Sequence, residues 1–295
     1  MPELPEILLY MRALDARIVG ETLERIRIAS PSLLKTFDPP LGAVSDKRVL
    51  GLRRLGKRIV IDLEDDLHLI IHLMIAGRFQ WKEHGAPVPR KLGHAAFDFS
   101  TGTLVLTEAG TKKRAQLFVV RGEEGVRAQD RGGLEPLEAS LAQFCAALTR
   151  ENRTLKRALT DPRLFSGIGN AHSDEILFEA QLSPARLARQ LSEEESARLY
   201  QATQKSLQEW TGILMEEAAD DFPSKVTAFH PKMAVHGRYN QPCPRCGARI
   251  QRIVYATNET NYCARCQTGG KLLADRAFSR LLRDDWPKTL EELEE

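Results

Sequence analysis

The sequence predicts an α+β protein with several domains: a mostly antiparallel β domain that opens with a helix, then a helical domain, then a small β-hairpin held by four cysteines. Two observations predict this order. β-rich runs and turn residues dominate the first 136 or so residues, whereas helical periodicity begins at about Leu137. Four of the five cysteines then form two Cys-x-x-Cys pairs.

With 42% hydrophobic and 28% charged residues, the chain has the composition of an ordinary soluble globular protein, which excludes wholesale disorder. It contains no apolar run of membrane-spanning length, and its first residues lack the basic start and apolar core of a secretory signal. We therefore expect a cytoplasmic protein without a membrane partner. The net charge is +2, but residues 284–295 carry six acids and one base, which leaves +7 on residues 1–283. This charge is compatible with nucleic acid, although most basic residues simply solvate a surface.

The chain begins Met1-Pro2-Glu3-Leu4-Pro5-Glu6, and a helix is expected over residues 3–18. Removal of Met1 would turn Pro2 into a free secondary amine, and an α-amino group has a pKa of only about 7.7–8.0. Such an amine condenses with an aldehyde-like carbon to a cationic iminium, and Glu3 beside it could carry the proton. The alternative is a proline-rich helix start without chemistry, because proline suits the first helical turn.

Two antiparallel hairpins are predicted in the first domain. Residues 58–64 and 67–73 are β-rich runs separated by Asp65-Asp66, and residues 95–99 and 103–107 flank a second turn.

The helical domain contains one long predicted helix and one candidate phosphate-binding turn. Ser192 and Glu195 form a capping box before a helix over residues 193–219, in which Trp210 is expected in the core. Residues 166–170 end in Gly-x-Gly-Asn just before the helical run 171–178. Glycines there would let a phosphate approach a helix N-terminus, with Arg153, Lys156 and Arg157 as nearby charge; the alternative is a tight helix–helix turn.

The cysteine pairs Cys243/Cys246 and Cys263/Cys266 have the spacing of a zinc site. Two tight turns at the ends of a hairpin would close a tetrahedral cage around one Zn²⁺ and leave no position for substrate, so the zinc should be structural. Two disulfides are the alternative, which the absence of a secretory signal disfavours. Residues 250–255 are expected in a strand, with residues 256–259 as the hairpin tip.

Taken in order, these segments resemble the formamidopyrimidine-DNA glycosylase and endonuclease VIII family of base-excision repair enzymes. The resemblance spans nearly the whole chain. The matching segments are residues 2–6, residues 56–58, His72-Leu73, residues 133–137, Lys156, residues 167–170 with Glu175, and residues 235–238 before the cysteine hairpin.

The resemblance implies a bifunctional DNA glycosylase and abasic-site lyase that flips a damaged base out of double-stranded DNA. It implies a catalytic β-sandwich over residues 1–136, a helix-two-turn-helix DNA-binding domain over residues 137–232, and a zinc finger over residues 233–268. Residues 269–295 would be a C-terminal extension. We expect a monomer whose partners are duplexes containing damaged bases or abasic sites.

The resemblance also assigns roles to single residues. Pro2 would be the nucleophile that forms the iminium, Glu3 the general acid that helps to open the sugar ring, and Glu6 a supporting residue. Successive β- and δ-eliminations would then cut the strand, which needs no metal and so agrees with a structural zinc. The expected phosphate contacts flanking the lesion are Lys57, which belongs to the catalytic group as well, and Lys156, Asn170 and Arg238.

Three departures from the family pattern bear on DNA recognition. The arginine expected twelve places after Cys246 is Asn258, a loss of charge that Arg249 or Arg252 could offset. Ile75, or Met74, stands where the family fills the space left by the flipped base. The loop that normally adds an arginine and a phenylalanine has no aromatic residue and reads Lys112-Lys113-Arg114, which either contacts the undamaged strand or is a solvated loop.

Further departures concern the lesion and the tail. His172 replaces a common tyrosine, and residues 221–233 are short where the family's 8-oxoguanine-capping loop lies, which argues against a standard 8-oxoguanine enzyme. The alternative function is a lyase-only or non-catalytic protein that binds damaged DNA. In the extension, a short amphipathic helix that packs back or meets a partner is expected from Leu272, Leu273, Phe278, Leu281 and Leu282.

Overall fold

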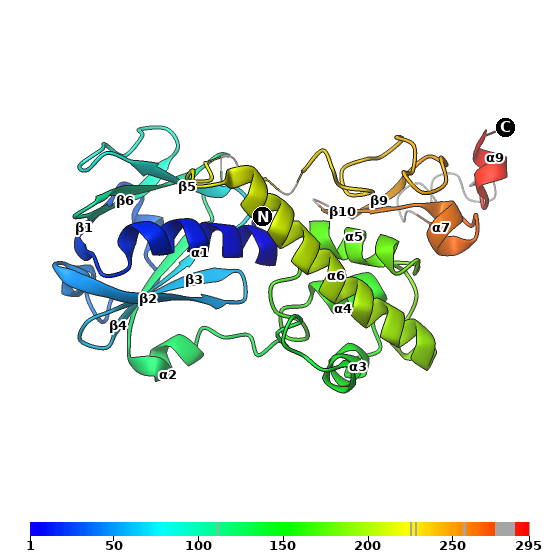
Figure 1. Ribbon diagram of the computed structural model, residues 1–295, viewed down its shortest axis with the longest axis horizontal. Coiled ribbons are helices and arrows are strands. Elements are labelled where there is room, and N and C mark those ends of the chain that lie inside the picture. Colours follow the sequence, from blue (N-terminus) through cyan, green and yellow to red (C-terminus); the bar gives the residue numbers. More distant parts are fainter. Residues whose placement is uncertain (111, 225, 228, 256–257, 275–286, 295) are drawn as a thin grey trace. The chain divides into compact units, whose positions relative to one another are not determined.

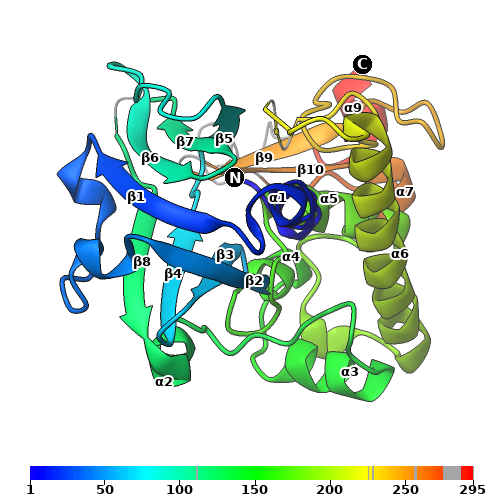
Figure 2. The ribbon, with the colours of Figure 1, turned by 60° about the vertical axis from the view of Figure 1, so that its left-hand side comes forward.

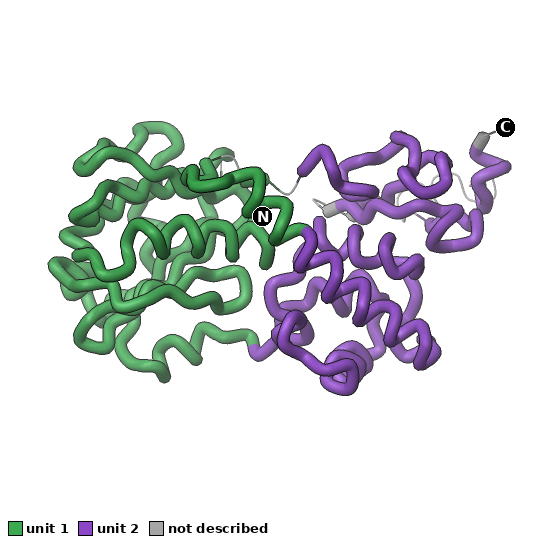
Figure 3. The backbone as a smooth tube through the Cα atoms, in the orientation of Figure 1, with its two compact units in different colours: residues 1–131, 210–228 green, residues 132–209, 229–295 purple. Residues whose placement is uncertain are grey.

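The computed structural model describes residues 1–295 except residues 111, 225, 228, 256–257, 275–286 and 295. The chain divides into two compact units, which Figure 3 colours separately. The first unit contains residues 1–131 and 210–228, and the second contains residues 132–209 and 229–295. The sequence-based division placed residues 210–228 in the helical domain, whereas in the structure they group with the first unit.

The first unit is a helix with an antiparallel sheet (Figure 1). Its helices are α1 (Leu4–Ile18) and the short α2 (Gly122–Arg127), and two 3₁₀ turns span Pro31–Leu33 and Leu41–Val44. The strands are β1 (Thr22–Ile28), β2 (Lys47–Leu55), β3 (Arg58–Leu63), β4 (Leu67–His72), β5 (Gly77–Lys82), β6 (Gly93–Phe99), β7 (Gly102–Glu108) and β8 (Gln116–Arg121).

The eight described strands follow the order β5-β7-β6-β1-β2-β3-β4-β8, and each pairing is antiparallel. The link between β1 and β2 is short, because only Thr22↔Arg48 and Leu23↔Lys47 pair. The sheet therefore separates into two groups of four strands, which Figure 2 shows apart from each other. Both predicted hairpins, β3–β4 and β6–β7, are confirmed.

α1 is buried along most of its length, which fixes the start of the chain in the first unit. Leu4, Ile7, Leu14 and Ile18 have no exposed surface and recur at helical spacing. Tyr10 packs edge-on against Phe79, with ring centroids 5.4 Å apart. Segment 210–228 is attached to the same helix, because the guanidinium of Arg12 donates to the carbonyl of Met215 over 2.9 Å.

The second unit combines short helices with a two-stranded hairpin. The helices are α3 (Leu141–Thr149), α4 (Leu155–Thr160), α5 (Asn170–Glu179), α7 (Ala264–Thr268) and α9 (Leu290–Glu294), with a 3₁₀ turn at Ala188–Gln190. The long helix α6 (Glu193–Ala218) begins in this unit, and its residues from Trp210 on belong to the first unit. The strands are β9 (Gln251–Tyr255) and β10 (Asn258–Tyr262). The capping box of α6 is confirmed, since the backbone N–H of Ser192 donates to Glu195 over 2.9 Å and that of Glu195 donates to the Ser192 hydroxyl over 3.1 Å. Trp210 is buried as predicted.

The described parts of the C-terminal extension, residues 269–274 and 287–294, pack back onto the zinc hairpin. Lys271 and Thr289 form an antiparallel bridge, and Leu272 and Leu290 are buried in the same apolar cluster as Ile250 and the other hairpin residues. Leu272 and Leu273 lie outside the described helices, so the expected amphipathic helix does not begin there. The rest of that prediction, Phe278, Leu281 and Leu282, lies outside the described residues, as do residues 256–257 of the expected hairpin tip.

Among the helices of the described ranges, none is both long enough and apolar enough to cross a membrane.

Candidate functional site

The N-terminal segment is anchored by the first turn of α1. Pro2 and Glu3 are buried, and Glu3 is the residue that precedes the helix. The backbone N–H of Glu3 donates to Oε2 of Glu6 over 2.8 Å, and Glu6 itself is 1% exposed. The Glu6 carboxylate therefore holds the backbone of Glu3, which has a predicted catalytic role, by accepting its N–H at the helix start.

The environment of the chain terminus favours a neutral amine. Burial is the main cause that lowers the pKa of the Met1 amine, and the cations Arg78 and Lys57 lower it further, while Glu3 and Glu6 raise it. A lower pKa means that more of the amine is unprotonated near neutral pH. An unprotonated amine is the form that attacks an electrophilic carbon.

Lys57 lies on the turn between β2 and β3, next to Gly56, whose φ of 63° requires glycine-like freedom. His72, at the end of the neighbouring β4, is opposite Arg58 in the register of β3 and β4. Burial and the charges of Arg58, Lys57 and Arg131 lower the pKa of His72 to about 4. The turns at this end of the sheet therefore carry positive charge and a neutral histidine.

Ile75 stands at the tip of a tight turn between β4 and β5. Its side chain is 52% exposed, and the turn is closed by the N–H of Gly77, which donates to the carbonyl of Leu73 over 2.9 Å. A Cβ at Gly77 would lie 2.2 Å from that carbonyl oxygen, so only glycine fits. The structure thus presents an exposed apolar residue on a rigid turn, which suits the predicted wedge.

The run Lys112-Lys113-Arg114 follows β7. Lys113 Nζ donates to the carbonyl of Gly93 over 2.9 Å, whereas Lys112 and Arg114 are exposed. The backbone N–H groups of Arg114 and Ala115 both donate to the buried carboxylate of Glu108. The sequence interpretation did not identify this carboxylate.

In the second unit, Lys156 and Asn170 are brought together. Lys156 Nζ donates to the carbonyl of Asn170 and to Oδ1 of Asp174, each over 2.6 Å. These bonds use two of the three N–H donors of the ammonium group. Asn170 is the first residue of α5, and its Nδ2 donates to the carbonyl of Glu259 in β10 over 2.8 Å.

Two adjacent acids of α5 hold the segment that leads to Arg238. Asp174 Oδ2 lies 2.8 Å from Nδ1 of His236 and accepts the N–H of Asn261 over 3.1 Å. Glu175 accepts the backbone N–H groups of Ala234, Val235 and His236 at 2.8, 2.9 and 2.9 Å. The family resemblance pointed to Glu175, but no sequence signal identified Asp174.

Arg238 donates to the carbonyl of Pro231 over 2.8 Å, so one end of its guanidinium is already held. On the hairpin, Arg252 stacks over the ring of Tyr239 at 4.2 Å and lies 3.7 Å from Glu259. Arg252 pairs with Asn261, whereas Asn258 pairs with Tyr255, which puts positions 252 and 258 on opposite faces of the hairpin.

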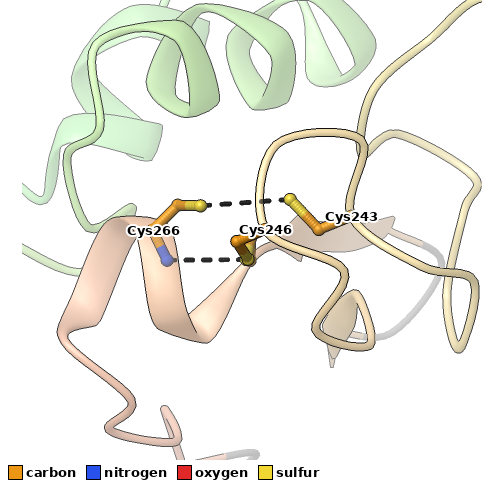
Figure 4. A group of neighbouring side chains, drawn as sticks. Cys243, Cys246 and Cys266 are labelled. Atoms are coloured by element: carbon orange, nitrogen blue, oxygen red, sulfur yellow. Dashed lines mark hydrogen bonds between the residues drawn. The ribbon is translucent and has the colours of Figure 1, made fainter.

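The zinc prediction fits the cysteine geometry. The sulfur atoms of Cys243, Cys246, Cys263 and Cys266 all lie within 4.8 Å of one another, and none forms a disulfide. Figure 4 shows Cys243 and Cys246 on the loop before β9 facing Cys266 of α7. The sulfur atoms of Cys243 and Cys266 are 3.9 Å apart and those of Cys246 and Cys263 are 3.5 Å apart. Both distances are close to the separation of about 3.8 Å that Zn–S bonds of about 2.3 Å give in a tetrahedron. One structural Zn²⁺ would hold the hairpin there.

Comparison with known proteins agrees with this geometry. Three family models match in order: the formamidopyrimidine-DNA glycosylase N-terminal domain at residues 1–115, its H2TH domain at residues 133–218, and the zinc finger found in FPG and IleRS at residues 240–269. The formamidopyrimidine-DNA glycosylase of Heliobacterium modesticaldum is 34% identical over 278 residues, covering 90% of this chain and 100% of the relative. The chain belongs to the formamidopyrimidine-DNA glycosylase family. The enzyme of Thermus thermophilus is likewise 34% identical, covering 92% of this chain and 100% of its own length.

Solved structures of the family match the fold. Lactococcus lactis formamidopyrimidine-DNA glycosylase bound to abasic-site DNA is 26% identical with a TM-score of 0.78, covering 90% of this chain and 99% of its own. MutM in complex with DNA containing carbocyclic 8-oxo-G is 27% identical with a TM-score of 0.80, covering 90% and 100%. The predicted fold class, including the helix-two-turn-helix domain and zinc hairpin, is confirmed. As a formamidopyrimidine-DNA glycosylase family member, the protein is a bifunctional DNA glycosylase and abasic-site lyase of base-excision repair.

Proposed function

We propose that this glycosylase excises oxidised bases from double-stranded DNA through the secondary amine of Pro2, after removal of Met1. The observation that carries the proposal is the buried start of the chain. In this segment burial lowers the pKa of the Met1 amine, which lies within electrostatic reach of the carboxylates of Glu3 and Glu6. The Pro2 amine that removal of Met1 would create lies in the same buried segment, with Glu3 beside it as a proton carrier.

The reaction would begin with a bond between the Pro2 nitrogen and C1′ of the damaged nucleotide. The bond from C1′ to the base breaks, and the base leaves with the bonding electrons and takes up a proton. Glu3 donates a proton to the ring oxygen as the bond from C1′ to O4′ breaks, which leaves an iminium between Pro2 and C1′. Glu6 acts as a positioning residue through its hydrogen bond to the Glu3 backbone.

The iminium acidifies the neighbouring C–H bonds, so that loss of a C2′ proton expels the 3′ phosphate in a β-elimination. A second proton loss expels the 5′ phosphate in a δ-elimination. Water then hydrolyses the link to C1′ and restores the Pro2 amine.

The proposed DNA contacts lie in both units. From the first unit we propose Lys57 for a phosphate, Ile75 for the space vacated by the base, and the run 112–114 for the undamaged strand. From the second unit we propose Lys156, Asn170 and Arg238 for phosphates. Two donors support these roles: the remaining N–H of Lys156, and Nε of Arg238, which has no partner among the described residues. The functional division at residues 136, 232 and 268, a monomeric state and a cytoplasmic location stay predictions.

Covalent trapping tests this mechanism. Protein without Met1 is incubated with duplexes containing an abasic site or one of several oxidised bases, borohydride is added, and the adduct is mapped by mass spectrometry. We expect an adduct at Pro2 with a damaged-base duplex. Pro2→Gly should lose strand cleavage by at least about a thousandfold, because a covalent step disappears, and keep DNA binding. Pro5→Gly, in the same helical turn, is the matched control; unchanged cleavage by Pro2→Gly would refute the assignment.

A second candidate function is supported by Asn258 and by the lack of an aromatic residue in the described part of the 109–115 loop. Both departures weaken base recognition and leave the lyase chemistry intact. A protein of this kind would form a covalent adduct with the abasic-site duplex only. Release of any damaged base from a duplex excludes this alternative.

A further inference from the structure

Two neighbouring loops of the first unit carry cations that have no acidic partner among the described residues. Arg90 and Lys91 lie in the loop before β6, and Lys112 and Arg114 lie in the loop after β7. All four side chains are exposed, and among the described residues none of them forms an ion pair or a hydrogen bond through its charged group. Lys113 adds a fifth, half-buried cation between them.

Other cations of the same unit are used internally. Arg27 pairs with Asp98 at 2.7 Å, and Arg53 pairs with Asp62 at 3.0 Å and with Glu123 at 2.7 Å. A guanidinium held by a carboxylate is partly neutralised and is a poor partner for an external anion. The cations of the two loops have no acidic partner among the described residues, so their charge is available to a phosphate backbone.

The two loops are joined into one edge by their own hydrogen bonds. The N–H of Glu108 donates to the carbonyl of Leu92 over 2.8 Å, and Lys113 Nζ donates to the carbonyl of Gly93 over 2.9 Å. The first bond joins the loop before β6 to the end of β7, and the second joins the loop after β7 to the start of β6. Both loops are therefore held at the same end of the β6–β7 pair.

A buried pair beneath the edge holds the second loop. His94 is 0% exposed and Glu108 is 2% exposed, and Nε2 of His94 lies 2.8 Å from Oε2 of Glu108. The same oxygen accepts the backbone N–H groups of Arg114 at 2.8 Å and Ala115 at 3.0 Å. One carboxylate oxygen thus fixes the backbone at the end of the cationic run.

The protonation states follow from this arrangement. Burial lowers the pKa of His94 below its ordinary value, although Glu108 opposes the shift, and Nδ1 of His94 has no partner among the described residues. We therefore assign a neutral imidazole with its proton on Nε2, donating to an ionised Glu108. A β-bulge between Gly93 and Ala95 turns His94 toward this carboxylate.

We propose that Arg90, Lys91, Lys112, Lys113 and Arg114 form one phosphate-binding edge for the undamaged strand of the duplex, and that His94 and Glu108 are its positioning residues. The choice of strand rests on the proposed function, which assigns the run 112–114 to that strand. That the edge binds phosphates does not rest on the proposed function, because contacts with phosphates depend on charge and spacing and not on the base sequence.

The edge is tested with an undamaged duplex, whose binding does not depend on the chemistry of Pro2. The slope of log Kd against log salt concentration reports the number of phosphates neutralised, at about 0.9 per contact. Arg90→Ala/Lys91→Ala should reduce this slope by about 2. The control Lys35→Ala/Arg48→Ala removes two exposed cations elsewhere in the unit and should leave the slope unchanged. Equal slopes for both double variants would overturn the proposal.

The strand is identified with an abasic-site analogue duplex that carries neutral methylphosphonates on one strand. Substitution on the undamaged strand should weaken binding of the wild type at least about tenfold, because contacts with charged phosphates are lost, and should affect Arg90→Ala/Lys91→Ala much less. If the variant instead loses sensitivity to methylphosphonates on the damaged strand, the edge binds the other strand and the proposal is wrong. Borohydride trapping at Pro2 is a separate readout, so failure of the edge and failure of the chemistry are distinguishable.

The positioning role is tested by conservative replacement. His94→Gln keeps an N–H donor near Oε2 of Glu108, whereas His94→Leu removes it. We expect His94→Leu to lower the salt slope by about 1 or more, through loss of ordered phosphate contacts, and His94→Gln to restore it. If both variants keep the wild-type slope while their melting temperatures fall, the pair is only structural.

Discussion

Glu108 in the first unit and Asp174 in the second are both buried carboxylates beneath a segment that we propose to meet DNA, but they hold different things. Glu108 binds backbone N–H groups and a neutral histidine. Asp174 binds the ammonium group of Lys156 together with His236. Glu108 therefore holds mainly the backbone of residues 114–115, whereas Asp174 holds the charged side chain of Lys156.

The difference extends to the units themselves. The first unit has a large apolar cluster formed by α1 and both groups of strands. The apolar cluster of the zinc hairpin is small, and its residues include the metal-binding Cys243 and Cys263. We therefore expect the zinc hairpin of the second unit to depend more on its metal than the first unit does.

Removal of zinc should produce the largest contrast between the units. Structural zinc contributes on the order of 10 kcal/mol or more to folding of a small zinc finger, so chelation should unfold the hairpin. Hydrogen exchange at β9 and β10 should rise steeply with a strong chelator, while exchange at β3 and β4 stays unchanged. Zinc added back serves as the control. Protected β9 and β10 amides in metal-free protein would mean that the apolar cluster holds the hairpin without metal.

Replacement of the two carboxylates sharpens the comparison at the level of single residues. Asp174→Ala leaves Lys156 as an unpaired buried charge and should lower the free energy of unfolding by about 3–5 kcal/mol. Glu108→Gln removes the carboxylate that binds His94 and two backbone N–H groups, all of which are uncharged donors. It should lower the free energy of unfolding by about 1–3 kcal/mol. Urea unfolding measures both.

Glu179→Ala is the control for these variants, because Glu179 is a partly exposed acid of α5 that pairs with Lys205. It should cost about 1 kcal/mol or less. If Asp174→Ala costs no more than Glu179→Ala, the ammonium group of Lys156 finds solvent when its partner is removed. The distinction between the two anchors would then fail.

The pH dependence of stability should distinguish the first unit from the second. The pKa of His72 is about 4 in the folded protein, against an ordinary value of 6.5. The unfolded state thus binds the proton more readily, and the free energy of unfolding should fall as the pH drops from about 6.5 toward 4, by at most about 3 kcal/mol. His72→Gln should flatten this part of the profile. A wild-type profile without a slope in this range would show that His72 is protonated in the folded state.

Much of the fold followed from local patterns. The runs around Asp65-Asp66 alternate or are continuously apolar and end at turn residues, so both hairpins were predictable. β2 was not identified from the sequence, because its segment is rich in charged residues: Lys47, Arg48, Arg53 and Arg54. Its strand state depends on pairing with β3, which no local pattern reveals.

The residues of the candidate site also differ in whether the local sequence reveals them. The four cysteines were identified from their spacing alone, and Pro2 could be proposed from its position in the chain. His94 and Glu108 were missed because they are 14 residues apart and meet only through the β6–β7 register and its bulge. Asp174 was missed because an acid in a helix usually faces solvent, and its burial depends on partners from α4, β10 and the segment before Arg238.

The hydrogen bond from Asn170 Nδ2 to the carbonyl of Glu259 bears on how the second unit behaves before it meets DNA. The carbonyl of Glu259 holds the amide in one orientation, and the second N–H of the amide would be left to donate to a phosphate in the proposed role. A phosphate that took the first N–H instead would replace the carbonyl as acceptor, and the net gain would be reduced by about 1 kcal/mol for the bond given up. In that role the side chain of Asn170 would already be oriented before DNA binds.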